Sequence, residues 1–458
     1  MKAPFRILMA AVFAAAIFVS CQKPAEEPEP EPEDLVDLVL KVPVTQDWIY
    51  SGRPTFTIHA ENPNRVAVQA EAMVRVSTDK GKQVVLFNKE VEVPAKGSLD
   101  IDMTVPQDLE PGFYKAACFM ANRSARIFGF GVNPGQVVSA PDKQADFDTF
   151  WDQGKAQLAA LDMNARLTEI PGKSSAQCKV YLVEIQSVPD GPEGDPVTVR
   201  GYYLEPQDGK AHPVIMHFYG YDTIGNFVSC PGANNGNYAE FYLSHRGQYI
   251  NRAPANKRGD GLPMDFENTY GDWFAFQFGD KDGYYYRGAF LDCVQAVRFM
   301  ATRPTSNMNL LFGEGASQGG ALSYAAAALS DYPFTAIAPC VAFLGDFPDY
   351  FKIVSWPAGT AESAWKKYTA THPGLTEADM YNFLSYFDTK NLVTRIRSTA
   401  VIACSGLQDG TCPPHTNTAP FNNLSVDDKV MYYYPELTHQ IPSNWPARYM
   451  AFFKERMK

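Results

Sequence analysis

Apolar and polar side chains alternate with the period of a β-strand from about residue 35 to residue 137. Turn signals such as Asn62-Pro63-Asn64 and Pro111-Gly112 separate the alternating runs. Seven strands are predicted, at 38–42, 55–60, 66–76, 84–93, 99–105, 113–119 and 125–132. This density of short strands is typical of an immunoglobulin-like β-sandwich, which we predict for residues 35–137. No residue in it indicates chemistry, so a structural spacer and a sugar-binding accessory are both open roles.

After residue 141 the pattern changes to strands that alternate with helices. Helices are predicted at 146–161, around 290–297 and from 447, and strands at 178–185, 197–204, 214–218, 400–404 and 430–434. Such alternation indicates an α/β fold, with a mainly parallel sheet and helices on both faces. We assign this domain to residues 142–458. Residues 347–382 interrupt the alternation and are predicted to form a lid or an insertion beside the site.

Residues 1–21 have the pattern of a secretory signal. Lys2 and Arg6 give a positive start, an apolar stretch follows from 7 to 19, and Cys21 ends the segment. A cysteine at this place resembles a bacterial lipobox, so Cys21 is the predicted lipidation site, with a plain secretory peptide as the alternative. Residues 22–34 are rich in proline and glutamate and predict an extended tether. We therefore expect a lipoprotein, held by its lipid at the outer membrane or cell surface of a Gram-negative bacterium, or otherwise a periplasmic protein.

Composition narrows the function classes. The formal net charge of -11 argues against nucleic acid as a partner, because a binder needs basic groups to neutralise phosphates. Seven cysteines follow Cys21, and neither they nor the histidines show a zinc-binding spacing, so no metal site is predicted. We expect most of these cysteines to be buried, and a single disulfide stays open.

The segment 313–320 carries the strongest chemical signal. Gly315, Ser317 and Gly319 fit the Gly-x-Ser-x-Gly nucleophile elbow. An apolar strand at 308–312 precedes it, and a run of small, helix-favouring residues at 321–329 follows. A serine on a sharp strand-to-helix turn is lifted clear of the backbone, and the glycines relieve the crowding of so tight a bend. We predict Ser317 as a nucleophile, against the alternative of an ordinary tight turn.

A nucleophilic serine needs a histidine base and a carboxylate that orients it. In α/β-hydrolases these follow the serine in the order acid, then histidine. His439 lies past the strand at 430–434 and is the predicted base, ahead of His372 and His415. Asp409 lies past the strand at 400–404, at the carboxyl end where ligand-facing groups gather, and is the predicted acid. Asp388 precedes its strand and is the second candidate.

The oxyanion hole needs two backbone amides. One is predicted to be that of Gln318, directly after the nucleophile. The other is predicted to be that of Tyr221, in the loop that follows the strand at 214–218. His217, at the end of that strand, is left without a role.

Several separated motifs in residues 142–458 resemble carbohydrate esterase family 7, the acetyl xylan esterases and cephalosporin C deacetylases. The motifs are 146–151 in the opening helix, Gly220-Tyr221, Arg246-Gly247-Gln248, Tyr284-Tyr285-Tyr286-Arg287, Ser317-Gln318-Gly319-Gly320, Tyr386-Phe387-Asp388, Gly406-Leu407 with Asp409, and Cys412-Pro413-Pro414. The resemblance implies an α/β-hydrolase fold and hydrolysis of acetyl esters by Ser317, Asp409 and His439, with no metal or organic cofactor. It also implies assembly into a homo-oligomer.

This chain departs from the family at several positions. Gln440 follows His439 where the family has glutamate, Gly345 stands where the family has cysteine, and His415 stands where a serine is common. The segment at residues 250–280 is longer and more divergent than the corresponding segment of the family. The domain at 35–137 lies outside the usual single-domain enzyme.

These features together predict a serine carboxylesterase that removes acetyl groups from acetylated xylo-oligosaccharides or from related small acetyl esters. A serine peptidase of the prolyl-oligopeptidase type shares the fold and a similar elbow, and is one alternative. A non-catalytic, glycan-binding surface lipoprotein is another, with the β-sandwich as its working part.

Overall fold

The computed structural model describes residues 35–221, 227–250 and 270–458. The predicted signal, the lipidation site Cys21 and the tether lie outside these residues, as does most of the divergent segment at 250–280. Within the described ranges, none of the helices combines the length and the apolar composition needed to cross a bilayer.

Residues 39–137 fold into two β-sheets, here called the N-terminal β unit. One sheet has the order β1 (Val39–Lys41), β3 (Thr55–Glu61), β6 (Ser98–Thr104). The other has the order β2 (Ile49–Tyr50), β8 (Arg123–Val132), β7 (Gly112–Met120), β4 (Val68–Thr78), β5 (Gln83–Val93). All pairs are antiparallel except β2 with β8. The seven strands predicted from the alternating pattern are present, and the two-residue β2 was missed.

Alternation along the strands produces the core of this unit. On β3 the side chains of Phe56, Ile58 and Ala60 are buried while their neighbours are partly exposed. The ring of Phe56 packs edge-on against Phe128 of β8 at 5.4 Å, so the two sheets share one apolar core. Burial of such aromatic side chains supplies most of the driving force for joining the sheets.

The rest of the chain is built on one mixed sheet of nine strands. Its order is β19 (Lys429–Tyr434), β18 (Ala400–Gly406), β17 (Ala336–Cys340), β16 (Ser306–Ala316), β12 (His212–Phe218), β14 (Ala239–Ser244), β11 (Val197–Pro206), β10 (Cys178–Ser187), β9 (Arg166–Glu169). The pairs from β19 to β14 are parallel, and those from β14 to β9 are antiparallel. The expectation of a mainly parallel sheet therefore holds for one part of it. Two residue pairs form a separate small ladder, β13 (Phe227–Val228) with β15 (Tyr249–Ile250).

Helices cover both faces of this sheet. They are α1 (Phe147–Ala160), α2 (Tyr285–Ala301), α3 (Gln318–Leu329), α4 (Phe347–Ile353), α5 (Ser355–Thr369), α6 (Glu377–Leu384), α7 (Thr389–Leu392), α8 (Pro414–Asn423) and α9 (Trp445–Arg456). Short 3-10 turns lie at Gln46–Trp48, Pro134–Gln136, Pro171–Lys173 and Val393–Arg395. Neighbours on β12 face opposite sides, since Val214 and Met216 join the core under α2 and α3, whereas Ile215 joins the core under α9.

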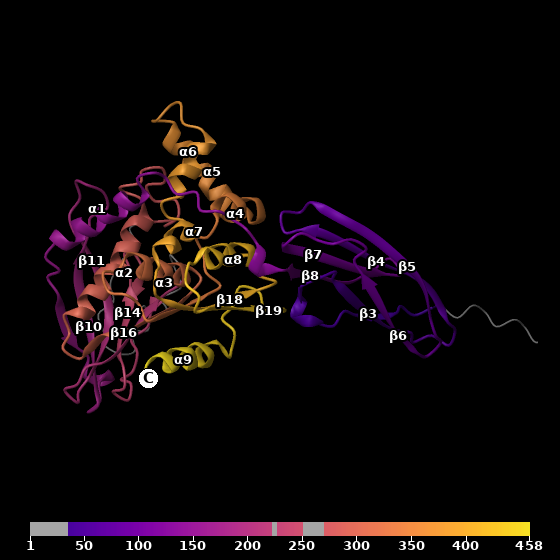
Figure 1. Cartoon of the computed structure of the whole chain (residues 1–458), viewed down its shortest axis with the longest axis horizontal. Coiled ribbons are helices and arrows are strands. Elements are labelled where there is room, and N and C mark those ends of the chain that lie inside the picture. The colour runs from indigo at the N-terminus through magenta and orange to yellow at the C-terminus, as the bar shows by residue number, and fades with distance from the viewer. Residues whose placement is uncertain (1–34, 222–226, 251–269) are drawn as a thin grey trace, which may run out of the picture.

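Two features frame the carboxyl end of the parallel strands. Residues 347–382, predicted as a lid or insertion, form α4, α5 and α6, which project from the body of the domain (Figure 1). The N-terminal β unit abuts the β18–β19 end of the sheet (Figure 1). Leu407, directly after β18, belongs to the core of that β unit.

Candidate active site

Ser317 stands at the bend between β16 and α3, with φ 57° and ψ −123°. A positive φ is costly for a residue with a Cβ atom, and such strain is characteristic of the nucleophile elbow. The flanking glycines are required by close approach. A Cβ atom on Gly315 would lie 2.3 Å from the carbonyl oxygen of Gly319, and one on Gly319 would lie 2.3 Å from that of Phe218. The bend therefore presents the serine hydroxyl above the carboxyl edge of the sheet.

Three predicted side chains meet in one hydrogen-bonded chain. The Nε2 atom of His439 lies 3.0 Å from Oγ of Ser317, and its Nδ1 atom lies 2.8 Å from Oδ2 of Asp409. The Asp409 side chain is fully buried, while that of His439 is about a quarter exposed. This arrangement lets the ring accept a proton from the hydroxyl on one side while a carboxylate holds it on the other.

The second oxygen of Asp409 is fixed by the backbone. Oδ1 accepts hydrogen bonds from the N–H groups of Thr411 and Cys412, each at 2.8 Å. Both groups belong to the loop between β18 and α8, so the turn that follows the strand orients the carboxylate toward His439. Two bonds to a carboxylate in a buried place are strong enough to set its rotamer.

The rival candidates lie elsewhere. Asp388 accepts the N–H groups of Asp346, Phe347 and Lys390, and thereby begins both α4 and α7. Burial raises the pKa of Asp388 to about 7. His372 is exposed and stacks on Tyr368. Neither takes part in the chain around Ser317.

Gln318, one predicted oxyanion donor, directly follows Ser317, and the ring of Tyr221, the other, lies 6.3 Å from that of Phe343, whose N–H donates to the carbonyl of Ser317 at 3.0 Å. Gln318 is the first residue of α3 and is fully buried, so its N–H belongs to the unpaired amides at a helix start. Tyr221 follows β12, and its hydroxyl donates to Asp272 at 2.8 Å. Within the described ranges, no protein acceptor takes the backbone N–H of either residue. An oxyanion hole is built from backbone amides that have no partner within the protein.

A buried network around the side chain of Gln318 was missed by the sequence reasoning. Its Oε1 accepts the hydroxyl of Tyr286 at 2.9 Å, and its Nε2 lies 2.9 Å from Nε2 of His245. The other ring nitrogen of His245 lies 2.9 Å from the hydroxyl of Tyr285, which donates to the carbonyl of Arg246. Burial lowers the pKa of His245 to about 4, so the ring is neutral and accepts from Gln318. Its place directly before Arg246-Gly247-Gln248 was the available signal.

Side chains of the Arg246-Gly247-Gln248 motif fix the backbone next to the same network. Arg246 is buried and pairs with both carboxylate oxygens of Asp292, at 2.9 and 2.7 Å. Such a bidentate pair fixes the orientation of the guanidinium and of the chain that carries it. Gln248, two residues on, donates from Nε2 to the carbonyl of Gly220 at 3.3 Å. Gly220 precedes Tyr221, so the motif supports the loop of the second predicted oxyanion donor.

The family model for acetyl xylan esterase (AXE1) matches residues 137–457. The chain belongs to this family. It is 22% identical over 430 residues to acetyl esterase Axe7A of Xylanibacter ruminicola, covering 92% of this chain and 91% of that protein. The resemblance to the acetyl xylan esterases stated from the motifs is thereby confirmed.

Solved acetyl xylan esterases share the fold. That of Paenibacillus sp. R4 is 27% identical with a TM-score of 0.57, covering 70% of this chain and 98% of that one. That of Thermoanaerobacterium sp. JW/SL YS485 is 23% identical with a TM-score of 0.56, covering 71% and 98%. The chain is a carboxylic ester hydrolase of the α/β-hydrolase fold.

Two departures from the acetyl xylan esterase pattern meet in space. His415 faces the N-terminal β unit, with Nδ1 3.2 Å from Asp79, and its Nε2 lies 3.1 to 3.2 Å from Asp349 and Asp346. Burial alone lowers the pKa of His415, but the hydrogen bonds to these carboxylates outweigh it and raise the pKa to about 11. A Cβ atom on Gly345 would lie 2.3 Å from the carbonyl of the residue after His415. His415 therefore belongs to the contact with the N-terminal β unit, whereas Gly345 leaves room for the backbone of the helix that carries His415.

The third departure has no such partner. Gln440 is exposed, and its side chain makes no hydrogen bond within the described residues. The loop of His439 is held instead by backbone bonds, among them the N–H of Gln440 to the carbonyl of Thr438 at 2.8 Å. All seven described cysteines are buried, and the structure forms no disulfide between any two of them.

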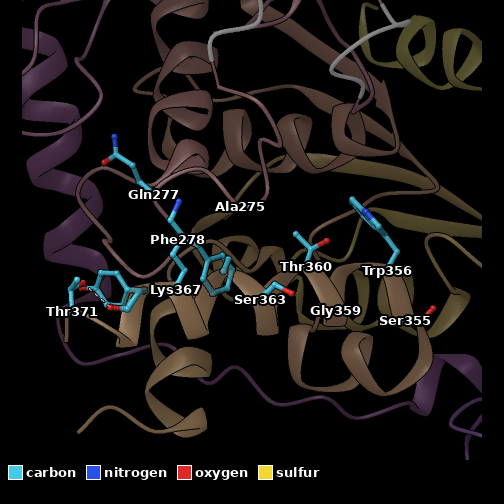
Figure 2. A pocket seen from close by; sticks show the side chains of 12 residues that line it. Ala275, Gln277, Phe278, Ser355, Trp356, Gly359, Thr360, Ser363, Lys367 and Thr371 are labelled. Carbon is cyan, nitrogen blue, oxygen red and sulfur yellow. Dashed lines mark hydrogen bonds between the residues drawn. The ribbon is translucent and has the colours of Figure 1, made fainter. Parts of the chain in front are cut away.

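A large open cavity lies beside the predicted oxyanion loop. Its volume is about 940 Å³, and one side is formed by a single face of α5 (Figure 2). Among the described side chains that line it are Trp356, Thr360, Ser363, Lys367, Gln277 and Phe278. Trp356 is 42% exposed, and its ring packs against those of Tyr221 at 5.6 Å and Phe343 at 5.8 Å. The tryptophan thus links this cavity to the residues around Ser317.

Proposed function

We propose that this protein hydrolyses acetyl esters of xylo-oligosaccharides or related sugars, with Ser317, His439 and Asp409 as its catalytic residues. The single observation that carries the proposal is the hydrogen-bonded chain of 3.0 and 2.8 Å through the ring of His439. Membership of the acetyl xylan esterase family supports the choice of acetyl as the acyl group.

In this mechanism His439 takes the proton of Ser317 as its oxygen attacks the acetyl carbonyl. Asp409 keeps the proton of Nδ1 in place and stabilises the imidazolium that forms. His439 then returns its proton to the departing sugar hydroxyl. A water molecule, activated by the same ring, attacks the acetyl-enzyme and releases acetate.

The oxyanion of each tetrahedral intermediate would be held by the backbone N–H groups of Tyr221 and Gln318. Each such donor contributes about 3 kcal/mol to lowering the barrier. His245 and Tyr286 support this role because they hold Gln318 by its side chain. No step requires a metal ion or an organic cofactor.

The cavity along α5 supports a sugar as the alcohol part of the ester. A cavity lined by an exposed aromatic ring at one end and by hydroxyl and amide side chains along its length suits a sugar, which has an apolar face and polar edges. Trp356 would stack on a sugar unit next to the acetylated one, and Thr360, Ser363 and Gln277 would bind its hydroxyl groups. Of the described side chains in this lining, only Lys367 carries charge.

The N-terminal β unit is proposed to be an immunoglobulin-like sandwich, since it has two mainly antiparallel sheets over one core. Ahead of it, Cys21 is proposed to carry the lipid that holds the protein at an outer membrane or cell surface. Incorporation of labelled palmitate into the full chain, and its loss in Cys21→Ser, tests the anchor.

Acetate release tests the activity. The protein is expected to release acetate from acetylated xylo-oligosaccharides and from p-nitrophenyl acetate, with rates that fall sharply for longer acyl chains. Ser317→Ala is expected to abolish both activities, whereas Ser330→Ala, at the far end of α3, is the matched control and keeps them. Full activity in Ser317→Ala would rule out this mechanism.

The same assay separates the alternatives. Cleavage of prolyl peptides without cleavage of acetyl esters would favour a serine peptidase of the prolyl-oligopeptidase type. Binding of xylo-oligosaccharides by an inactive wild-type protein would favour a non-catalytic glycan-binding lipoprotein.

A further inference from the structure

One side chain joins the N-terminal β unit to the loops of the predicted acid and base. Gln408 lies between Leu407 and Asp409. Its Oε1 accepts the N–H of Gly129 at 2.7 Å, and its Nε2 donates to the carbonyl of Gly129 at 3.0 Å and to that of Pro435 at 2.6 Å. All three partners are backbone groups, so the amide is held in a fixed orientation.

The side-chain amide of Gln408 forms the hydrogen bonds to β8 that a neighbouring strand would form. β8 pairs with the short β2 only through Gly131 and Val132, which leaves the backbone edge at Gly129 for another partner. Gln408 takes both the N–H and the C=O of that residue. This is the hydrogen-bond pattern by which a sheet edge accepts an added strand.

Close approach at the same point excludes a larger residue. A Cβ atom on Gly129 would lie 2.3 Å from the carbonyl oxygen of Leu407. The Leu407 side chain is buried in the core of the β unit, although it belongs to the loop after β18. The β unit therefore contacts the backbone of the acid loop, rather than being connected to it by a linker alone.

The same two loop residues hold the loop of the base. The N–H of Leu407 donates to the carbonyl of Tyr434 at 2.9 Å, and that of Gln408 donates to the carbonyl of Leu437 at 3.0 Å. With the bond to Pro435, these contacts tie residues 407–409 to the segment that leads to His439. A cavity of about 280 Å³ lies beside Gln408 and Asp409, so side-chain packing does not fill this side of the loop. The position of this loop therefore depends more strongly on the hydrogen bonds of Gln408.

We propose that Gln408 is a positioning residue through which the N-terminal β unit sets the relative placement of Asp409 and His439. The inference rests on the proposed roles of those two residues. It makes the β unit a working part of the esterase, instead of a spacer or a separate sugar-binding accessory.

Two variants of the full chain test the contact from its two sides. Gln408→Ala removes the three hydrogen bonds, and Gly129→Ala forces the β unit away from the acid loop. Each is expected to lower kcat for p-nitrophenyl acetate about ten- to a hundred-fold with KM unchanged, because displacement of reacting groups by a fraction of an ångström has effects of this size. Lys80→Ala is the matched control, since it breaks the 2.6 Å pair with Asp349 across the same contact without touching Gln408, and it is expected to keep kcat.

Gln408→Glu separates positioning from a general loss of fold. An ionised carboxylate repels the carbonyls of Gly129 and Pro435, whereas a protonated carboxyl can donate to one of them and accept from Gly129. The ratio of its kcat to that of the wild type is therefore expected to rise as the pH is lowered from about 8 to about 6, because burial raises the pKa of a carboxyl above its ordinary value. The corresponding ratio for Gln408→Ala is expected to stay constant over that range.

Hydrogen exchange gives a readout that does not depend on activity. In Gln408→Ala the amides of residues 407–412 and 435–440 are expected to exchange faster than in the wild type, and in Lys80→Ala they are not. Unchanged kcat in folded Gln408→Ala would overturn the proposal, whether or not exchange changes. An inactive wild type with faster exchange in Gln408→Ala would mean that the proposed function is wrong and that the contact itself is real.

Discussion

The Nε2 atom of His245 lies 2.9 Å from the side-chain nitrogen of Gln318, the residue whose backbone N–H is a predicted oxyanion donor. Both residues are buried. Because the pKa of His245 is lowered to about 4 by burial, its ring stays neutral and keeps an acceptor toward Gln318 at neutral pH. A buried histidine thus holds the side chain at the first turn of α3.

His245→Phe is expected to leave the amide of Gln318 without an acceptor. A buried unsatisfied donor costs about 1–3 kcal/mol, so the free energy of unfolding should fall by that amount in urea titrations. The kcat for p-nitrophenyl acetate should fall by roughly ten-fold, which is less than the loss of a whole oxyanion donor. His212→Phe, at a pair with the exposed Asp208 away from Gln318, is the control and should change neither quantity. Wild-type kcat in His245→Phe would separate this network from catalysis.

Replacement of Asp409 and replacement of Asp388, the two candidate acids, should have different effects on activity and stability. Asp409→Asn is expected to lower kcat on the order of 10⁴-fold while leaving the melting temperature nearly unchanged, because an amide holds the ring of His439 in the wrong tautomer. Asp388→Asn is expected to lower the melting temperature and leave kcat of the folded enzyme intact, because Asp388 begins two helices. Steady-state kinetics and thermal unfolding of both variants check this, and an exchange of the two outcomes would reassign the acid.

The predicted reacting residues could be found from the sequence because chemistry places them at strand ends in a set order. Ser317, Asp409 and His439 each follow an apolar run that is a parallel strand in the structure. Strands β9 and β14 of the nine-stranded sheet were missed, and so was β17. The latter reads Ala-Ile-Ala-Pro-Cys, whose small residues and proline give little strand signal.

The supporting residues could not be found in the same way. His245 and Gln318 are 73 positions apart, and Gln408 and Gly129 are 279 apart. No local period or motif spacing links such pairs, since they meet only when separate elements pack. The departure at His415 was visible in the sequence, but its reason was not, because its partner Asp79 lies in the other unit.

Alkaline pH should weaken the structure through His415. Its pKa is about 11 in the folded protein and near 6.5 when unfolded, so its contribution is fully present below about 6.5 and is lost as pH rises through about 11. Between about pH 7 and pH 9 the wild type should lose about 1.4 kcal/mol of unfolding free energy per pH unit relative to His415→Asn. The groups that face the ring are Asp79, Asp346 and Asp349, with Lys80 and Lys352 paired to the last.

Urea titrations of both proteins at several pH values measure this difference. Parallel curves for the wild type and His415→Asn would show that His415 is neutral in the folded protein.

Replacement of Trp356 should weaken the hydrolysis of sugar esters and leave that of small esters unchanged. Loss of its ring in Trp356→Ala removes about 1 kcal/mol of stacking, so KM for acetylated xylo-oligosaccharides should rise about five-fold while kcat/KM for p-nitrophenyl acetate stays constant. Trp356→Phe keeps a ring against Tyr221 and Phe343 and should recover most of the effect. Ser363 lies on the same face of α5 as Trp356. Ser363→Trp keeps Trp356 but fills the cavity, and should raise the KM for acetylated xylo-oligosaccharides. An equal change for both substrates in Trp356→Ala would place its effect on the oxyanion loop, through the contact with Tyr221, and would remove the cavity from the substrate path.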